Sequence, residues 1–353
     1  MIRATKEFWR GKRVLLTGHS GFKGSWLTLW LSRLGAEVVG VSLPPNTEPN
    51  LFTLARLGDF CQSNFCDIRN FEELALLIEA SKPEVIFHLA AQPLVRASYS
   101  KPVDTFATNV MGTVNVLQAL RNLSCVKVAV MVTTDKVYKN LELNRPFREN
   151  DILGGHDPYS SSKAASELVI GSYSDSYLAE QGVAVGIARA GNVIGGGDWS
   201  VDRLIPDAVR AWTAGDALEI RHPEAIRPWQ HVLEPLAAYL TLAQGLWIKP
   251  DLAGSYNFGP ESSSAASVRE LVELARDHYP KASVNYLETS SGPHEAGFLS
   301  LSTEKALAEL GVRARWDLPL SVKHTMDWYL AQGRGADARQ LCEENISAYE
   351  CLL

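Results

Sequence analysis

The chain has 353 residues, of which 46% are hydrophobic and 21% are charged, and its formal net charge at pH 7 is -6. This size and composition are typical of a globular protein with room for one or two hydrophobic cores. Because 34 lysines and arginines are set against 40 acidic residues, with no long run of one sign, we expect no nucleic-acid partner.

Cysteine usage and the N-terminal residues bear on the compartment. The cysteines number five, are scattered through the chain and lack the spacing of metal ligands, so we expect reduced thiols and no metal site. The first residues lack the apolar stretch of a signal peptide, and no segment reaches the roughly 18 apolar residues of a membrane span. We therefore expect a cytoplasmic protein that does not bind a membrane.

Apolar runs alternate with amphipathic stretches through the first half of the chain. The runs expected to form strands are 12–18, 36–43, 83–92, 126–134 and 183–195, and the expected helices are 22–35, 71–81, 102–122 and 158–180. This alternation is typical of a parallel sheet with helices on both faces. We predict an α/β fold with a Rossmann-type, doubly wound parallel sheet over residues 1–195.

The alternation stops beyond residue 195, where glycine, proline and serine become more frequent. Helical patterns remain near 267–279, 303–310 and 319–332, without regular strands between them. We predict a smaller C-terminal α/β domain over residues 196–353 that binds the substrate. Residues 226–250 are expected to return to the first domain, with a strand at 227–232 joining its sheet.

Three glycines follow the first predicted strand. Gly18, Gly21 and Gly24, in TGHSGFKGSW, form a G-x-x-G-x-x-G variant of the dinucleotide fingerprint. The first glycine makes the tight turn, the second lets the backbone approach a pyrophosphate, and the third allows close packing of helix on strand. A tight turn without a ligand is the alternative, but the position between a strand and a helix favours a cofactor site.

The end of the second predicted strand bears on which dinucleotide binds. It offers Ser42 and Asn46 but no carboxylate for the ribose hydroxyls, and no arginine for a 2′-phosphate. We therefore expect NAD and not NADP. Asp67, in FCDIRN between the runs 36–43 and 83–92, is a candidate for the adenine end, although the dipole of the following helix would equally favour a carboxylate there.

Tyr159 and Lys163 are spaced by four residues, which places both on one face of a helix. A lysine ammonium, together with a positively charged nicotinamide, would lower the pKa of the tyrosine and prepare it as a base. The Y-x-x-x-K pattern alone is common. The glycine turn and Thr134, at the end of a predicted strand, favour catalysis, and Asp135 and Lys136 leave the sheet at the same edge.

Together these motifs resemble the extended short-chain dehydrogenases/reductases and, among them, the nucleotide-sugar 4,6-dehydratases. The likeness extends over nearly the whole chain, through TGHSGFKGSW, FHLAAQ, TNVMGT, TTDKVY, YSSSK, RAGNVIGGGDW, DRLIP, RPWQHV and YNFGP. The Asp-Lys pair, GGGDW, RPWQHVLEP and PHEA are most similar to the dehydratases that act on CDP-glucose. The related dTDP-glucose enzymes have Glu as the second member of the pair.

The resemblance implies a reaction. Tyr159 would take the proton of the sugar 4-hydroxyl while C4 gives hydride to NAD, with Thr134 holding that oxygen and Lys163 holding the nicotinamide ribose. The resulting 4-ketone acidifies the C5 hydrogen, and Asp135 with Lys136 would supply the acid and the base that eliminate water from C5 and C6. Lys136 can instead stay charged and stabilise the enolate, or the pair can share one proton. A solvated ion pair in a loop is the plain structural alternative.

The resemblance also implies binding residues. Those for the cofactor are Gly18, Gly21, Phe22, Gly24, Ser42, Asp67, Ile68, Leu89, Ala90, Ala91, Thr108, Asn109, Tyr159 and Lys163. Those for the nucleotide sugar are Gln92, Thr134, Asn192, Arg203, Arg227, Asn257 and His294, each of which can also be a turn former, a surface cation or a loop residue.

The resemblance further implies a homodimer, or a dimer of dimers, built on the helices that carry Asn109 and Tyr159. The apolar pattern of 102–120 also suits a helix buried on its own sheet.

Three alternative functions differ in their requirements. An epimerase would oxidise and reduce C4 without needing an acid for the C6 hydroxyl, and Asp135 with Lys136 argue against it. A dinucleotide-binding redox sensor would have no need of Thr134, Tyr159 and Lys163 together. An oxidase of the sugar would consume NAD stoichiometrically.

Overall fold

The computed structural model describes residues 5–141, 145–261, 265–279, 281–287 and 297–353. Its central feature is a seven-stranded sheet with the order β11-β6-β5-β4-β1-β2-β3, in which every neighbouring pair is parallel. The strands are β1 (Arg13–Thr17), β2 (Glu37–Ser42), β3 (Gln62–Phe65), β4 (Val85–His88), β5 (Val128–Val132), β6 (Ala184–Ala190) and β11 (Gly254–Phe258). The predicted doubly wound parallel sheet is confirmed.

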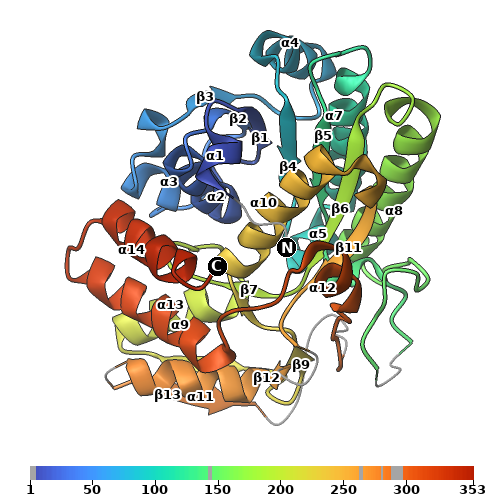
Figure 1. Cartoon of the computed structure of the whole chain (residues 1–353). Coiled ribbons are helices and arrows are strands. Elements are labelled where there is room, and N and C mark those ends of the chain that lie inside the picture. The colour runs from blue at the N-terminus through green and yellow to red at the C-terminus, as the bar shows by residue number, and fades with distance from the viewer. Residues whose placement is uncertain (1–4, 142–144, 262–264, 280, 288–296) are drawn as a thin grey trace.

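Helices cover both faces of this sheet (Figure 1). Successive strand residues point to opposite faces, so Val14 and Leu16 pack in one hydrophobic core and Leu15 in the other. The first core includes α2 (Phe22–Arg33) and α10 (Leu233–Ile248), and the second includes α4 (Phe71–Ser81), α7 (Gly112–Leu120) and α8 (Pro158–Tyr173). Short helices α1 (Lys6–Trp9), α3 (Leu51–Leu54), α5 (Val95–Ser100) and α6 (Pro102–Phe106) lie between these elements in sequence.

The two long predicted helices of the first half are each extended by a π-helical turn. Residues Ala107–Met111 join α6 to α7, and Ser174–Leu178 continue α8. Helix α8 begins where Asp157 accepts a hydrogen bond from the Ser160 amide and proline occupies the first helical turn. This start fixes the register of the helix that carries Tyr159 and Lys163.

The second half of the chain adds helices and three two-stranded sheets, β10-β7, β12-β9 and β13-β8. The helices are α9 (Leu204–Ala214), α11 (Val268–His278), α12 (Glu304–Leu310), α13 (Leu318–Gly333) and α14 (Ala338–Glu350), and the strands are β7 (Val193–Ile194), β8 (Ala217–Ile220), β9 (Ile226–Arg227), β10 (Gln230–His231), β12 (Ala266–Ser267) and β13 (Ser283–Tyr286). None of the helices in the described ranges is long and apolar enough to cross a membrane.

The prediction that a strand at 227–232 joins the main sheet is wrong. Its residues form β9 and β10, which pair with β12 and β7 and not with the main sheet. Proline at position 228 has no amide hydrogen to donate between them. The main sheet instead gains β11, which lies parallel to β6 with Gly254 opposite Gly186.

Candidate active site

The carboxyl ends of the main strands open into one large cavity. Its volume is about 1340 Å³, which exceeds the roughly 300 to 1,000 Å³ of most single-ligand pockets. Its wall joins the loops that follow β1 to β6 with residues of the second half, among them Arg203, Glu219 and Arg227. The cavity therefore has room for two ligands side by side.

The glycine turn after β1 forms one wall of the cavity, and two of its glycines have no room for a Cβ. Gly18 has a φ of +80°, and a Cβ on it would lie 2.8 Å from the amide nitrogen of Ala90. A Cβ on Gly24 would lie 2.0 Å from the carbonyl oxygen of Gly18. Gly21 is the N-cap of α2, and no side chain caps that helix. The amide groups of the first turn are therefore available to an anion at the cavity wall.

The predicted adenosine end lies further along the same wall. Ser42, Asp67 and Ile68 line the cavity, but the Ser42 hydroxyl already contacts His19 Nδ1 and donates to main-chain and side-chain oxygens beside it. Asp67 pairs with Arg69 at 2.6 Å, and the Arg69 guanidinium lowers the pKa of that carboxyl. The carboxylate after β3 is thus the acidic group at this end of the wall.

The turn after β4 closes the cofactor side of the cavity. The Thr17 hydroxyl accepts hydrogen bonds from the amides of Leu89 and Ala90, at 3.1 and 3.2 Å. Leu89, Ala90 and Ala91 line the cavity, as do Phe22 and Thr108. The structure thus brings these predicted cofactor residues together around the cavity.

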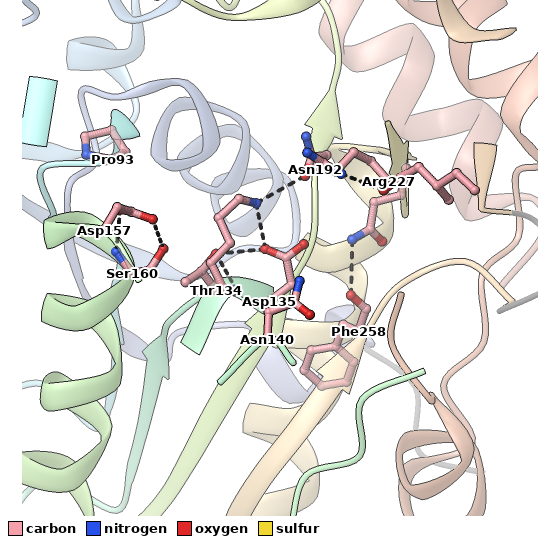
Figure 2. Close-up of polar contacts among 12 residues, drawn as sticks. Pro93, Thr134, Asp135, Asn140, Asp157, Ser160, Asn192, Arg227 and Phe258 are labelled. Carbon is pink, nitrogen blue, oxygen red and sulfur yellow. Dashed lines mark hydrogen bonds and ion pairs between the residues drawn. The ribbon is translucent and has the colours of Figure 1, made fainter. Parts of the chain in front are cut away.

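The predicted elimination pair lies at the end of β5, in a short helical turn at Asp135–Val137. Asp135 is fully buried, and its Oδ1 accepts from the Thr134 hydroxyl at 3.0 Å and from Lys136 Nζ at 2.9 Å. Lys136 Nζ also donates to Asn192 Oδ1 at 3.3 Å, and Figure 2 shows Thr134 and Asp135 beside each other with Asn192 above them. Within the described residues, Asp135 Oδ2 is buried and has no hydrogen-bond partner.

Tyr159 and Lys163 face this pair from α8. Both side chains are buried at the cavity wall, and Lys163 Nζ donates to the carbonyl oxygen of Val132 at 2.9 Å. Burial raises the pKa of Tyr159, whereas a hydrogen bond with Thr134 lowers it. Burial also lowers the pKa of Lys163 to about 8, although the Glu167 carboxylate acts in the opposite direction. One tyrosine and two lysines thus converge on Thr134 and Asp135.

The predicted substrate residues divide into those that line the cavity and those whose side chains bond to the protein itself. Asn192, Arg203 and Arg227 line the cavity, and Arg203 donates to the carbonyl oxygen of Pro93 at 3.3 Å. His294 lies outside the described residues.

Three predicted amides bind the protein itself. The Gln92 amide bonds to the backbone of Leu94 and to Thr105, and the Asn109 amide bonds to the backbone of Gln92 and to Ser162. The Asn257 amide is buried and bonds to Tyr138 and to two backbone carbonyls. The structure does not bring these three residues to the cavity wall.

The comparisons with known proteins agree with this geometry. The family model for GDP-mannose 4,6 dehydratase matches residues 15–325. The chain is 44% identical over 350 residues to CDP-glucose 4,6-dehydratase of Salmonella typhimurium, and the match covers 98% of both proteins. The chain belongs to the nucleotide-sugar 4,6-dehydratase family.

This dehydratase-family chain also has more distant relatives. It is 27% identical over 343 residues to dTDP-glucose 4,6-dehydratase of Haemophilus influenzae, covering 90% of this chain and 97% of the relative. The solved UDP-glucose-4-epimerase of Stenotrophomonas maltophila, with bound NAD and formylated UDP-arabinopyranose, is similar in fold, with a TM-score of 0.77, 22% identity, and coverage of 92% and 99%. The dTDP-glucose 4,6-dehydratase of Bacillus anthracis, in complex with NAD, has a TM-score of 0.75, 24% identity, and coverage of 91% and 97%.

Sequence reasoning missed one cation in the dehydratase cavity. Lys23 lines the wall in the first turn of α2, where the helix dipole disfavours a positive charge. Burial and, next, the neighbouring charge of Arg203 lower its pKa to about 8. A lysine in the first helical turn, directly after the glycine motif, breaks a local rule, and such exceptions mark functional sites.

Proposed function

We propose that this dehydratase-family protein converts CDP-glucose to CDP-4-keto-6-deoxyglucose and water with NAD as a resident cofactor. The observation that carries the proposal is the placement of Asp135 and Lys136 beside Thr134 and opposite Tyr159 at one cavity wall. The relative with 44% identity, named as a CDP-glucose 4,6-dehydratase, supports the choice of nucleotide.

The glycine turn fits the dinucleotide. Gly18 and Gly24 let the turn pack tightly against the backbone of Ala90 and against the turn itself, and the uncapped amides at the start of α2 would bind the pyrophosphate. Asp67 would hold the adenosine end, and Lys163 would hold the nicotinamide ribose. When bound, NAD would supply reversible hydride transfer, first from C4 of the sugar and then to C6, so the reaction would have no net redox change.

Tyr159 acts on the sugar 4-hydroxyl. As hydride leaves C4, the phenolate oxygen takes the hydroxyl proton, and the Thr134 hydroxyl orients the oxygen that becomes the ketone. The Thr134 hydrogen bond and the Arg203 charge lower the pKa of Tyr159 and so offset part of the rise caused by burial.

Asp135 and Lys136 then eliminate water. The 4-ketone acidifies the C5 hydrogen, which leaves as a proton while the C5–C6 double bond forms and the C6–O bond breaks. Asp135, protonated at the unpartnered Oδ2, donates to the leaving hydroxyl. Lys136 either removes the C5 proton or, as an ammonium, stabilises the enolate oxygen.

Binding of the nucleotide sugar would use the second half of the chain. Arg203 and Arg227 offer planar guanidinium groups that suit a diphosphate, and Asn192 is already oriented by Lys136. We therefore retain the division into a dinucleotide-binding part, residues 1–195, and a mainly substrate-binding part, residues 196–353. Helix α10, within 226–250, belongs with the first part because it packs against β5 and β6.

Assembly and location complete the proposal. Exposed apolar side chains of α6 to α8 favour a homodimer, or a dimer of dimers, through paired helices; they are Val103, Phe106, Met111 and Leu168. All five cysteines are free, which favours a reducing compartment and hence the cytoplasm.

The test is incubation with CDP-glucose, dTDP-glucose or GDP-mannose in deuterated water with catalytic NAD. A 4-keto-6-deoxy product that carries deuterium at C5, formed fastest from CDP-glucose, is the expected result. An intact 6-hydroxyl in the product would indicate an epimerase. Stoichiometric NADH would indicate an oxidase, and NAD binding without any turnover would indicate a sensor.

A further inference from the structure

A buried ion pair lies behind the catalytic residues. Arg189, on β6, and Glu167, on α8, have side chains that are 3% and 1% exposed. The guanidinium donates to both carboxylate oxygens of Glu167. Neither residue lines the cavity, so the pair is not in contact with a ligand there.

Arg189 also holds the segment that follows the elimination pair. Its Nη1 donates to the Tyr138 hydroxyl at 2.8 Å and to the Glu149 carbonyl oxygen at 2.9 Å. The guanidinium lies 4.9 Å from the centre of the Tyr138 ring. The Tyr138 hydroxyl in turn donates to Asn257 on β11 at 2.6 Å. Tyr138, two residues after Lys136, is therefore fixed by groups from two other parts of the chain, β6 and β11.

Glu167 holds the segment that precedes the elimination pair. The Thr133 hydroxyl donates to Glu167 Oε1 at 2.6 Å. Glu167 also lies one helical turn beyond Lys163 on the same helix. The residues on either side of Thr134, Asp135 and Lys136 are thus both bonded to one ion pair, and one member of that pair belongs to the helix that carries Tyr159.

Burying two charges costs several kcal/mol each, so an ion pair of this kind contributes little net stability. Its best-supported use is to select one arrangement among alternatives. We propose that Arg189 and Glu167 are positioning residues that hold Asp135 and Lys136 in register with Tyr159, so that water is eliminated before the 4-keto intermediate leaves. This inference rests on the proposed dehydratase reaction and adds residues that do not touch the substrate.

The two halves of the reaction should respond differently to loosening of this contact. Tyr159 and Lys163 lie on α8 itself, and Lys163 has its own bond to Val132, so of the groups that act in C4 oxidation only Thr134 depends on the anchored segment. Asp135 and Lys136 depend on the anchored segment 133–138. A small displacement of a reacting group can lower a rate by about a hundredfold, and here that loss falls on elimination.

Two conservative variants test the proposal. Thr133→Val and Tyr138→Phe each remove one hydroxyl from the network with little change in volume. We expect C4 oxidation within about threefold of wild type, and a fall in water elimination of about ten- to a hundredfold. The measured partition is the ratio of the oxidised intermediate, detected as NADH and released 4-keto hexose, to the 4-keto-6-deoxy product. Amide hydrogen exchange over residues 133–138, in the protein without ligands, should be faster in both variants.

Controls separate positioning from general destabilisation. Tyr349→Phe also removes a buried hydroxyl from a buried carboxylate, Glu234 at 2.7 Å on α10, and should leave the partition unchanged. Arg189→Lys keeps the charge but cannot span Glu167, Tyr138 and Glu149, so it should shift the partition in the same direction and further. If it fails to fold, the two hydroxyl variants still decide.

The proposal is overturned if both hydroxyl variants leave the partition at the wild-type value, or if they lower oxidation and elimination by the same factor. Failure of the proposed function would give a different result, because wild-type protein would then yield no 4-keto-6-deoxy product from any of the three nucleotide sugars.

Discussion

Lys136 is the residue whose role is most open to direct measurement, because it contacts both Asp135 and Asn192. In Lys136→Met the side chain keeps much of its length but can neither take a proton nor carry a charge. We expect substrate still to reduce NAD in a single turnover, while elimination falls by about a hundredfold or more. Rapid-quench analysis of the hexose checks this. Lys127→Met, which changes an exposed lysine before β5, is the control. Elimination at the wild-type rate by Lys136→Met would show that Lys136 has no part in the reaction.

Two buried histidines predict how stability depends on pH. His88 and His231 are 2% and 0% exposed, and burial lowers the pKa of each from 6.5 to about 3. Between these pH values the unfolded chain binds more protons than the folded one, so the free energy of unfolding falls as the pH is lowered. At about pH 5 the loss is roughly 2 kcal/mol for each histidine.

Urea unfolding between pH 7 and pH 4 measures this slope. His231→Phe should reduce the slope by about one proton relative to wild type. Equal slopes for His231→Phe and wild type would contradict the assignment.

At the scale of an element, the start of α2 depends on Gly24. A Cβ there would meet the Gly18 carbonyl at 2.0 Å, so Gly24→Ala must move the turn away from the helix. We expect a loss of about 2 kcal/mol or more in unfolding free energy, and no rise in melting temperature on addition of NAD. Gly333→Ala, at the end of α13 with no atom within 4 Å of the added Cβ, should unfold like wild type and keep the response to NAD.

The exposed apolar side chains of α6 to α8, where we propose that two copies meet, predict the effect of a charge on assembly. Leu168 on α8 is 67% exposed, and an arginine there would be buried without a partner if two copies meet at this face. Leu168→Arg should weaken self-association by at least about tenfold, measured by sedimentation velocity. Leu76→Arg, on α4 and 68% exposed, is the matched control. A Leu168→Arg protein that sediments like wild type would place the interface elsewhere.

At the scale of the whole molecule, the sequence predicted the strands and helices that depend on local residue patterns. The strands of the main sheet and the helices at 102–122 and 158–180 follow from periodicity and from glycine, proline and capping residues. Helix α10 was not predicted, because its residues are buried on almost every side and an all-apolar helix has no amphipathic period. Strand β11 was missed because Gly254–Phe258 is short and begins with glycine.

The candidate site could be predicted where it consists of contiguous motifs. The glycine turn, residues 134–136, Tyr159 and Lys163 were proposed from the sequence, and the structure gathers them around one cavity. Gln92, Asn109 and Asn257 show the limit, because an amide can bind a ligand or a buried backbone group equally well. Only the fold decides which, since the choice depends on loops far apart in sequence.

The position of β11 has a consequence for synthesis of the chain. Strand β11 pairs with β6 in the main sheet, and α10 packs against β5 and β6, yet both elements are translated after the loops that line the substrate side of the cavity. In a nascent chain that ends at residue 195, one edge of β6 has no partner strand, and β6 carries the charged side chain of Arg189. We expect ribosome-bound chains to gain a protease-resistant sheet only after Phe258 has left the exit tunnel. The cofactor half of the site is thus translated first, but it is completed only after most of the loops on the substrate side have been made.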